Sequence, residues 1–384
     1  MVNKNIGVIS KGITCPIIRE GDDIVDIVVN SVINATKIGQ KMRPPTPFAK
    51  GLVLVPNEYE YDLSHKDVIG ITESVVARAA GLYVTVDEIA EDIKKKFGEN
   101  ADITLVNPIY SRNRFSMILK GIARAARTIT FVMPDYDEVG NPSGVNPFTG
   151  VNIKQYYADI CKNENCPTVF VKTFMMNSYN KNVLYCGLHK YEDWILNNTD
   201  LDIEKRYCTL ANICSDKNPD FGLLGSNKAT EERLKLFPTV ALASKVCEEI
   251  KEKIIEKTGK DVIVMVYGDG SYKDLDAGIW EMADPVSSPG YTDKELLDST
   301  PNEIKVKAYA DDKFKNLSGD ELEEAIKNEI SLNKGKNLKG TMTSQGTTPR
   351  RYVNLLASLM DLTSGSGDRC TPIVIIRNYF KRDY

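Results

Sequence analysis

The chain has 384 residues, of which 42% are hydrophobic and 27% are charged, and its formal net charge is −4. These values are ordinary for a folded globular protein, and the length allows one large domain or two to three smaller ones. The acidic balance argues against a nucleic-acid partner, which would require a basic stripe. No apolar stretch is long enough to span a membrane, and the N-terminus lacks the apolar region of a signal peptide. We therefore expect a cytoplasmic protein.

Apolar runs and helical patterns follow one another along the whole chain. Strands are predicted at residues 52–55, 67–72, 103–106, 128–132, 168–173, 261–267 and 372–377. Helices are predicted at 22–36, after capping boxes that begin at Thr85 and Ser318, at 240–257 and at 351–362. The order lacks the regular βαβ rhythm of a doubly wound sheet. We therefore predict an α+β (mixed α/β) fold with mixed sheets, and not a Rossmann fold.

The segment 135–220 differs from its flanks because it is rich in Asn, Tyr and Cys. It includes Gly140-Asn-Pro-Ser-Gly144 near its start and closes at Lys217-Asn-Pro-Asp220. We interpret it as an insertion or subdomain, since it contains a strand of its own. The predicted parts are therefore 1–134, 135–220 and 221–384.

Five of the eight cysteines lie in this segment, together with one of the two histidines. The pairs Cys161-x4-Cys166 and Cys186-x2-His189 could be zinc ligands. Their spacing is irregular, however, and buried free cysteines are common in proteins that are not exported. Structural thiols are the favoured interpretation, and a zinc site is the alternative.

One acid stands at the end of an apolar run. The predicted strand at 261–267 leads directly into Gly268-Asp269-Gly270. A carboxylate at the end of a buried strand is well placed for metal or phosphate chemistry. Asp-Gly between strands is also a strong hairpin signal, so a plain turn is the competing interpretation.

Four segments combine glycine with hydroxyl or charged side chains, at 222–228, 268–270, 344–351 and 364–368. Such loops let backbone N–H groups approach an anion, although none matches the Walker A or the G-x-G-x-x-G spacing. Taken together they suggest a polyanionic ligand such as a nucleotide. Five arginines could add charge, although structural ion pairs are the better interpretation for most of them: Arg78, Arg112, Arg114, Arg124 and Arg127.

Several of these segments occur in the order that is found in a known family. The stretches Gly12-Ile-Thr-Cys-Pro-Ile-Ile-Arg-Glu-Gly-Asp-Asp23 and Asp67-Val-Ile-Gly-Ile-Thr-Glu-Ser-Val-Val-Ala-Arg-Ala-Ala-Gly81 resemble the opening of the coenzyme F-420-0:gamma-glutamyl ligase family. Later blocks are similar too, namely Gly222-x-x-x-Ser-Asn227 with Leu236-Phe-Pro238, 262–270 and 352–377. The segment 135–220 has no counterpart that we can assign.

The resemblance implies a two-lobed amide ligase that joins L-glutamate to a carboxylate of a small-molecule acceptor. It implies GTP as the nucleotide, with ATP left open, together with Mg or Mn and an acyl-phosphate intermediate. It also implies a homodimer, with neither nucleic acid nor membrane as a partner.

The resemblance also assigns roles to positions of this chain. Asp269 would bind the metal and, with Arg78, act in catalysis; Arg78 replaces a phosphate-contacting lysine. The nucleotide would be contacted by Cys15, Pro16, Ile17, Ile18, Glu73, Ser74, Arg78, Asn227, Gly365, Ser366 and Gly367.

Three positions depart from the pattern of the family. Leu224 stands where the family has a metal-binding aspartate, Gly270 offers no ligand after Asp269, and Ser366 replaces a glutamine. Losing a carboxylate removes charge that Mg would need. Possible substitutes are Asp274, Asp276, Glu281, Asp284 and Asp368. The alternatives to a ligase are a non-catalytic nucleotide- or anion-binding protein on the same scaffold and a structural protein whose glycine loops are plain turns.

Overall fold

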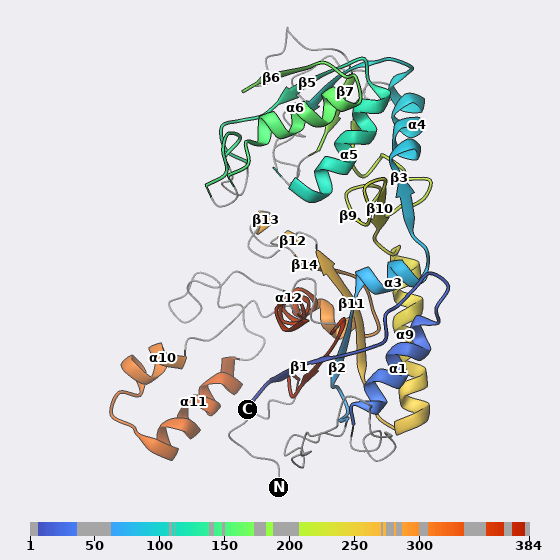
Figure 1. Cartoon of the computed structure of the whole chain (residues 1–384). Helices are drawn as coiled ribbons and strands as arrows, with labels where there is room; N and C mark the ends of the chain where they lie inside the picture. The colour runs from blue at the N-terminus through green and yellow to red at the C-terminus, as the bar shows by residue number, and fades with distance from the viewer. Residues whose placement is uncertain are drawn as a thin grey trace, which may run out of the picture. The chain divides into compact units, whose positions relative to one another are not determined.

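The computed structural model describes residues 7–36, 63–106, 110, 112–137, 142–147, 150–172, 182–186, 207–269, 272–273, 280–281, 286–298, 306–333, 351–364 and 371–380. The chain divides into two compact units (Figure 1). Unit 1 consists of Met1–Val76 and Ala241–Tyr384, and unit 2 consists of Ala77–Val240. The predicted insertion 135–220 lies within unit 2, together with residues 77–134.

Unit 1 is built on a mixed sheet of five strands. Their order across the sheet is β1 (Ile9–Ile13), β15 (Ile373–Arg377), β2 (Val68–Thr72), β11 (Ile263–Asp269) and β14 (Val286–Tyr291). β2 and β11 run parallel, and all other neighbouring pairs are antiparallel. The strands predicted at 67–72, 261–267 and 372–377 are thereby confirmed, whereas the run at 52–55 lies outside the described residues.

Helices cover both faces of this sheet (Figure 1). On one face lies α12 (Tyr352–Ser364), whose Met360 packs in one apolar cluster with Tyr267 of β11 and Val374 of β15. On the other face α9 (Val240–Thr258) approaches β14 so closely that a Cβ atom at Gly290 would lie 2.5 Å from the Ala243 backbone. The layers are therefore helix, sheet and helix.

The helix α1 (Ile24–Asn34) runs beside α9 (Figure 1). It begins where expected, because the Asp23 side chain accepts a hydrogen bond from the Asp26 backbone N–H. Lys253 of α9 forms an ion pair with Asp26 at 2.7 Å, and this pair ties the first turn of α1 to α9.

Unit 2 contains a parallel sheet. Its strand order is β6 (Thr168–Val171), β5 (Thr128–Val132), β4 (Asp102–Val106), β7 (Asn182–Tyr185) and β8 (Tyr207–Thr209). All four neighbouring pairs are parallel. The helices α5 (Arg112–Ala125) and α6 (Ile153–Asn163) connect β4 to β5 and β5 to β6. This part has the βαβ connections that the sequence pattern did not predict.

A large apolar cluster forms the core of unit 2, and a smaller one includes Val106 and Tyr185. Ile103 and Leu105 of β4 contribute to the large cluster from the sheet, Ile118 from α5 and Tyr157 from α6. The helix α4 (Val86–Phe97) adds Ile89 and starts at the predicted capping box, in which Thr85 and Glu88 exchange hydrogen bonds. A small antiparallel sheet completes the unit, with the order β3 (Tyr83–Thr85), β10 (Arg233–Leu236) and β9 (Ser226–Lys228).

The remaining elements are short or peripheral. They are α3 (Glu73–Ala79), β12 (Tyr272–Lys273), β13 (Trp280–Glu281), η2 (Lys294–Leu297), α10 (Val306–Ala308), η3 (Tyr309–Lys313) and α11 (Gly319–Asn333). The described helices and mixed sheets confirm an α+β fold that is not a Rossmann fold as a whole. No helix in the described ranges is both long and apolar enough to cross a bilayer.

Candidate functional site

The ends of four strands meet at one edge of the unit 1 sheet. β2 and β11 are parallel and pair Thr72 with Tyr267 at their carboxyl ends. At the same edge, Ile13 at the end of β1 pairs with Ile373 at the start of β15. We call this edge, defined by Ile13, Thr72, Tyr267 and Ile373, the strand-end edge. Carboxyl ends of parallel strands commonly hold ligands because the backbone there is fixed.

Asp269 is the last residue of β11 and pairs with Val286 of β14. β11 lies between β2 and β14, so Asp269 is at the end of an internal strand of the sheet. The predicted strand thus extends to Asp269, and the next described strand, β12, pairs with β13. The Asp269 side chain lies outside the described part of the structure, as do Gly270, Asp274, Asp276, Asp284 and Asp368; Glu281 is described only as backbone in β13.

Glu73 directly follows β2 and lies across the end of β11. Its side chain is buried, with 3% of its surface exposed. A Cβ atom added to Gly268 would lie 2.0 Å from the Glu73 Cγ atom and 3.2 Å from its carboxyl carbon. Position 268 therefore requires glycine, because any side chain would displace Glu73. The structure thus brings a buried carboxyl group to within one residue of Asp269.

The predicted nucleotide segment 15–18 leaves the sheet at the same edge, directly after β1. Cys15 is half-buried and Pro16 is exposed. Ile18 is 3% exposed and anchors the segment in the core, whereas Ile17 is 79% exposed. An isoleucine this exposed, next to the buried Ile18, is available to contact a ligand.

The two ends of the C-terminal glycine turn also reach the strand-end edge. The Thr371 hydroxyl donates a hydrogen bond to the Ser364 carbonyl at 3.0 Å. Thr371 also packs against Gly12, where an added Cβ atom would lie 2.9 Å from the Thr371 Cβ atom. Ser364 and Thr371, which flank residues 365–370, are therefore in contact with each other, and Thr371 also contacts Gly12, while Gly365, Ser366 and Gly367 lie outside the described residues.

The buried Tyr267 lies next to Ser364 at the strand-end edge. Burial raises the pKa of its hydroxyl, and the neighbouring Ser364 side chain partly offsets this effect. Tyr267 therefore stays protonated and uncharged at neutral pH. Its role at the strand-end edge is to pack in the core.

Other predicted residues lie in α3 and in β9. Ser74 is half-buried in the first turn of α3, and Arg78 is exposed in its last turn. Asn227 lies half-buried in β9, opposite Lys235 of β10. Leu224 packs against the core of unit 2, which explains an apolar residue at this position.

The backbone conformation and the packing at position 222 require glycine. Its φ angle is +50°, and an added Cβ atom would lie 2.4 Å from the Ala211 carbonyl oxygen. The glycine of this predicted anion loop is therefore explained by packing alone.

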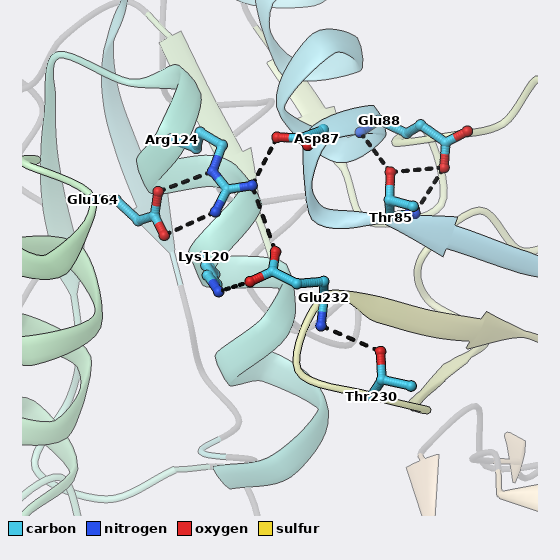
Figure 2. Close-up of polar contacts among 8 residues, drawn as sticks. All are labelled: Thr85, Asp87, Glu88, Lys120, Arg124, Glu164, Thr230 and Glu232. Carbon is cyan, nitrogen blue, oxygen red and sulfur yellow. Dashed lines mark hydrogen bonds and ion pairs between the residues drawn. The ribbon is translucent and has the colours of Figure 1, made fainter.

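Two of the candidate arginines form structural ion pairs within unit 2. Arg124 donates to both carboxyl oxygens of Glu164, at 2.9 and 3.0 Å, and to Asp87 at 2.7 Å (Figure 2). Arg127 is paired with Asp102, which lowers the pKa of that carboxyl group to about 2. For these two arginines the structural interpretation is supported. The side chains of Arg112 and Arg114 lie outside the described part.

The central cysteines are packed thiols. Cys161, Cys166, Cys186 and Cys214 are buried. Burial raises the pKa of Cys166 to about 11 and that of Cys214 to about 12, so both stay protonated at neutral pH. Among the described residues no three His, Cys, Asp or Glu side chains gather as they would around a metal ion, and His189 lies outside that set.

Sequence reasoning missed two features of the edge, namely the contact of Glu73 with Gly268 and the hydrogen bond from Thr371 to Ser364. A glycine directly before the strand-end acid was the visible signal for the first contact. The second had no signal, because it depends on how α12 and β15 pack.

Together these features define an α+β protein of two units, in which one edge of a mixed sheet carries the buried Glu73 and the contact between Ser364 and Thr371. Residues 12–378 match the family model described as F420-0:Gamma-glutamyl ligase. This match spans nearly the whole chain, and the chain belongs to that family. A search of curated proteins found no match.

Proposed function

We propose that this chain is a nucleotide- and divalent-metal-dependent amide ligase that adds L-glutamate to a carboxylate of a cofactor-like acceptor. Membership of the family supports ligase chemistry with glutamate. The observation that carries the proposal is the strand-end edge, where Glu73 and the end of β11 lie side by side. The segment after β1 starts at the same edge, where Thr371 contacts Ser364.

The proposed reaction has two steps, because a carboxylate is a poor electrophile. In the first step an oxygen of the acceptor carboxylate attacks the terminal phosphorus of GTP or ATP, and the nucleoside diphosphate leaves. In the second step the amine nitrogen of glutamate attacks the carbonyl carbon of the acyl phosphate. The C–O bond to phosphate breaks, inorganic phosphate leaves, and the proton of the amine passes to solvent.

The residues of the chain would mainly supply position and charge, which is what phosphoryl transfer requires. Cys15, Pro16, Ile17 and Ile18 would line the nucleotide site, with further contacts from Ser74, Arg78, Asn227 and the turn at 365–367. Asp269 would hold Mg or Mn at the end of β11, and the buried Glu73 packs against the neighbouring Gly268. When bound, the ion would neutralise charge on the phosphate oxygens.

The test uses the full chain with GTP or ATP, Mg or Mn, L-glutamate and a panel of carboxylate acceptors that includes F420-0 and pterins. We expect phosphate release that requires both glutamate and one acceptor. Thermal stabilisation by nucleotide without turnover would favour the binding-protein alternative, for which Leu224 is the specific observation. Absence of stabilisation by either nucleotide would exclude both functions, because a ligand that binds only the native state must raise its melting temperature.

The dimer that the resemblance implies is part of the same proposal. Sedimentation equilibrium of the full chain measures its mass in solution, and a monomer at all concentrations would contradict it.

A further inference from the structure

The chain enters β15 between the ends of two other strands at the strand-end edge. Ile373, the first residue of β15, pairs with β1 on one side, at Ile13, and with β2 on the other. One residue earlier, the Pro372 carbonyl accepts a hydrogen bond from the Thr72 backbone N–H at 2.9 Å. We call Thr371 and Pro372 the β15 entry.

The Thr371 side chain contacts two neighbouring elements. Its hydroxyl donates a hydrogen bond to the Ser364 carbonyl at the end of α12, at 3.0 Å. A Cβ atom added to Gly12 of β1 would lie 2.9 Å from the Thr371 Cβ atom, and 3.2 Å from both its methyl carbon and its hydroxyl oxygen. The whole side chain therefore lies against Gly12, and β1 approaches this closely because residue 12 has no side chain.

The end of α12 is held to β1 at two places. The hydrogen bond from Thr371 is partly buried, and its acceptor residue Ser364 is 7% exposed. Removing the donor of a buried carbonyl group costs free energy, because water does not readily take its place. A second contact joins the hydroxyl groups of Ser10 in β1 and Thr363 in α12 at 2.7 Å.

The segments that the proposed function assigns to the nucleotide begin at the β15 entry. They are residues 15–18 after β1, 73–74 after β2 and 365–367 after α12. Each begins within three residues of a group that Thr371 or Pro372 contacts, namely Gly12, the Thr72 N–H and the Ser364 carbonyl. A shift of the β15 entry would therefore move the three segments relative to one another.

We propose that Thr371 is a positioning residue for the nucleotide. Its hydroxyl holds the end of α12, and its carbon atoms pack on Gly12, so the three segments take their relative places from this side chain. A binding site keeps its affinity only while its contacts are held in place, so a looser β15 entry should weaken nucleotide binding. The inference rests on the proposed function and adds a residue that the resemblance does not assign.

The test measures the Kd of GTP and of ATP for the full chain by calorimetry with Mg²⁺ present, together with the melting temperature without nucleotide. Thr371→Val keeps the shape of the side chain and removes the hydroxyl donor. We expect it to raise the Kd by about three- to tenfold, the size expected for one lost hydrogen bond. Thr371→Ser keeps the donor and should stay within about twofold of the parent chain.

Thr258→Val is the matched control for a purely structural role. The Thr258 hydroxyl donates to the Ile254 carbonyl at 2.6 Å, near the end of α9 and away from the strand-end edge. This control should leave the Kd unchanged even where its melting temperature falls as much as that of Thr371→Val. A lower melting temperature in Thr371→Val with an unchanged Kd would show that the bond is only structural, and it would overturn the inference.

Gly12→Ala disturbs the same contact from β1 and carries the test in the case that Thr371→Val does not fold. The added methyl group would meet Thr371 at 2.9 Å and must displace it. We expect the Kd to rise by at least about threefold, and an unchanged Kd would contradict the inference. Gly7→Ala is the control, because no atom lies within 4 Å of an added Cβ atom there.

The outcomes distinguish this inference from the proposed function. Nucleotide binding by the parent chain that is weaker in both Thr371→Val and Gly12→Ala supports the inference. Equal binding by the parent chain and Thr371→Val overturns the inference and leaves the proposed function intact. If the parent chain binds neither nucleotide, the proposed function fails and the inference fails with it.

Discussion

Asp67 and Arg377 form an ion pair that joins the start of β2 to the end of β15, with 3.2 Å between Oδ2 and Nε. Asp67 is completely buried, and its Oδ2 atom also accepts a hydrogen bond from the Ser64 backbone N–H at 2.8 Å. The pair lies at the end of the sheet opposite the strand-end edge. It therefore helps to hold the register of β2 and β15.

Replacing Arg377 with Met should destabilise unit 1, because it leaves a buried charge without its partner. We expect a loss of about 3 kcal/mol in the free energy of unfolding, measured by urea denaturation. Lys66→Met is the matched control, since Lys66 forms a more exposed pair with Glu295. That control should lose less than about 1 kcal/mol, and equal losses in the two variants would show that burial of the pair is unimportant.

Asp269→Asn should abolish metal-dependent nucleotide binding or turnover with little effect on folding. The change keeps the shape of the side chain at the end of β11 but removes its charge. Nucleotide binding with and without Mn²⁺, measured by calorimetry, checks this, and circular dichroism checks the fold. Activity equal to that of the parent chain would count against the metal assignment.

Arg78→Ala should weaken nucleotide binding without lowering stability, because Arg78 is exposed at the end of α3. Loss of one charged hydrogen-bond donor corresponds to about 1.5–3 kcal/mol, or a 10- to 100-fold rise in Kd. Arg78→Lys, which keeps the charge, should lose less. An unaltered Kd in the alanine variant would remove this residue from the site.

Gly222→Ala should destabilise unit 2 by about 3 kcal/mol, since it combines a left-handed backbone with a backbone clash at Ala211. Gly150→Ala is the control. Its φ angle is +67°, but no atom lies within 4 Å of an added Cβ atom, so only the backbone strain should appear, at about 1 kcal/mol. Chemical denaturation of both variants gives the comparison. A loss in Gly222→Ala no larger than in the control would argue against the clash.

Unit 2 should lose stability in acid through Asp102. Hydrogen bonds from Arg127 and Thr128 lower the pKa of Asp102 from 3.8 to about 2. A carboxyl group with a lowered folded-state pKa contributes its full stabilisation above the unfolded-state pKa and loses it as the pH falls toward the folded-state pKa. The stability should therefore decline between about pH 4 and pH 2, and Asp102→Asn should flatten this decline. Denaturation curves across this range test the sign, and an unchanged slope in the variant would assign the acid sensitivity to other groups.

The sequence predicted elements well where a run of apolar residues is buried, as at 67–72 and 261–267. It could not predict that these two runs pair in parallel, because about 190 residues separate them and register depends on packing across the sheet. The parallel sheet of unit 2 was missed for the same reason. Its strands were found individually at 103–106, 128–132 and 168–173, but their neighbours were not.

The sequence predicted where some residues of the candidate site lie along the chain, but it did not predict which side chains contact one another. Asp269 could be placed at a strand end from its flanking glycines, and the structure agrees. The reason for the glycine at 268 could not be read from the sequence, since the side chain that requires it follows a different strand. Likewise, comparison with the family pattern suggests that Leu224 replaces a metal ligand. Only the structure shows that Leu224 packs against the core of unit 2.

The position of β15 between β1 and β2 has a consequence for synthesis of the protein. On the ribosome, residues 77–240 are complete early and form a continuous stretch that can fold as a unit. The sheet of unit 1 must wait, because the strand that joins its first two members is among the last residues translated. The sheet that carries the candidate site can therefore form only when translation is almost complete. A chain that stops before residue 373 would leave β1 without its neighbouring strand.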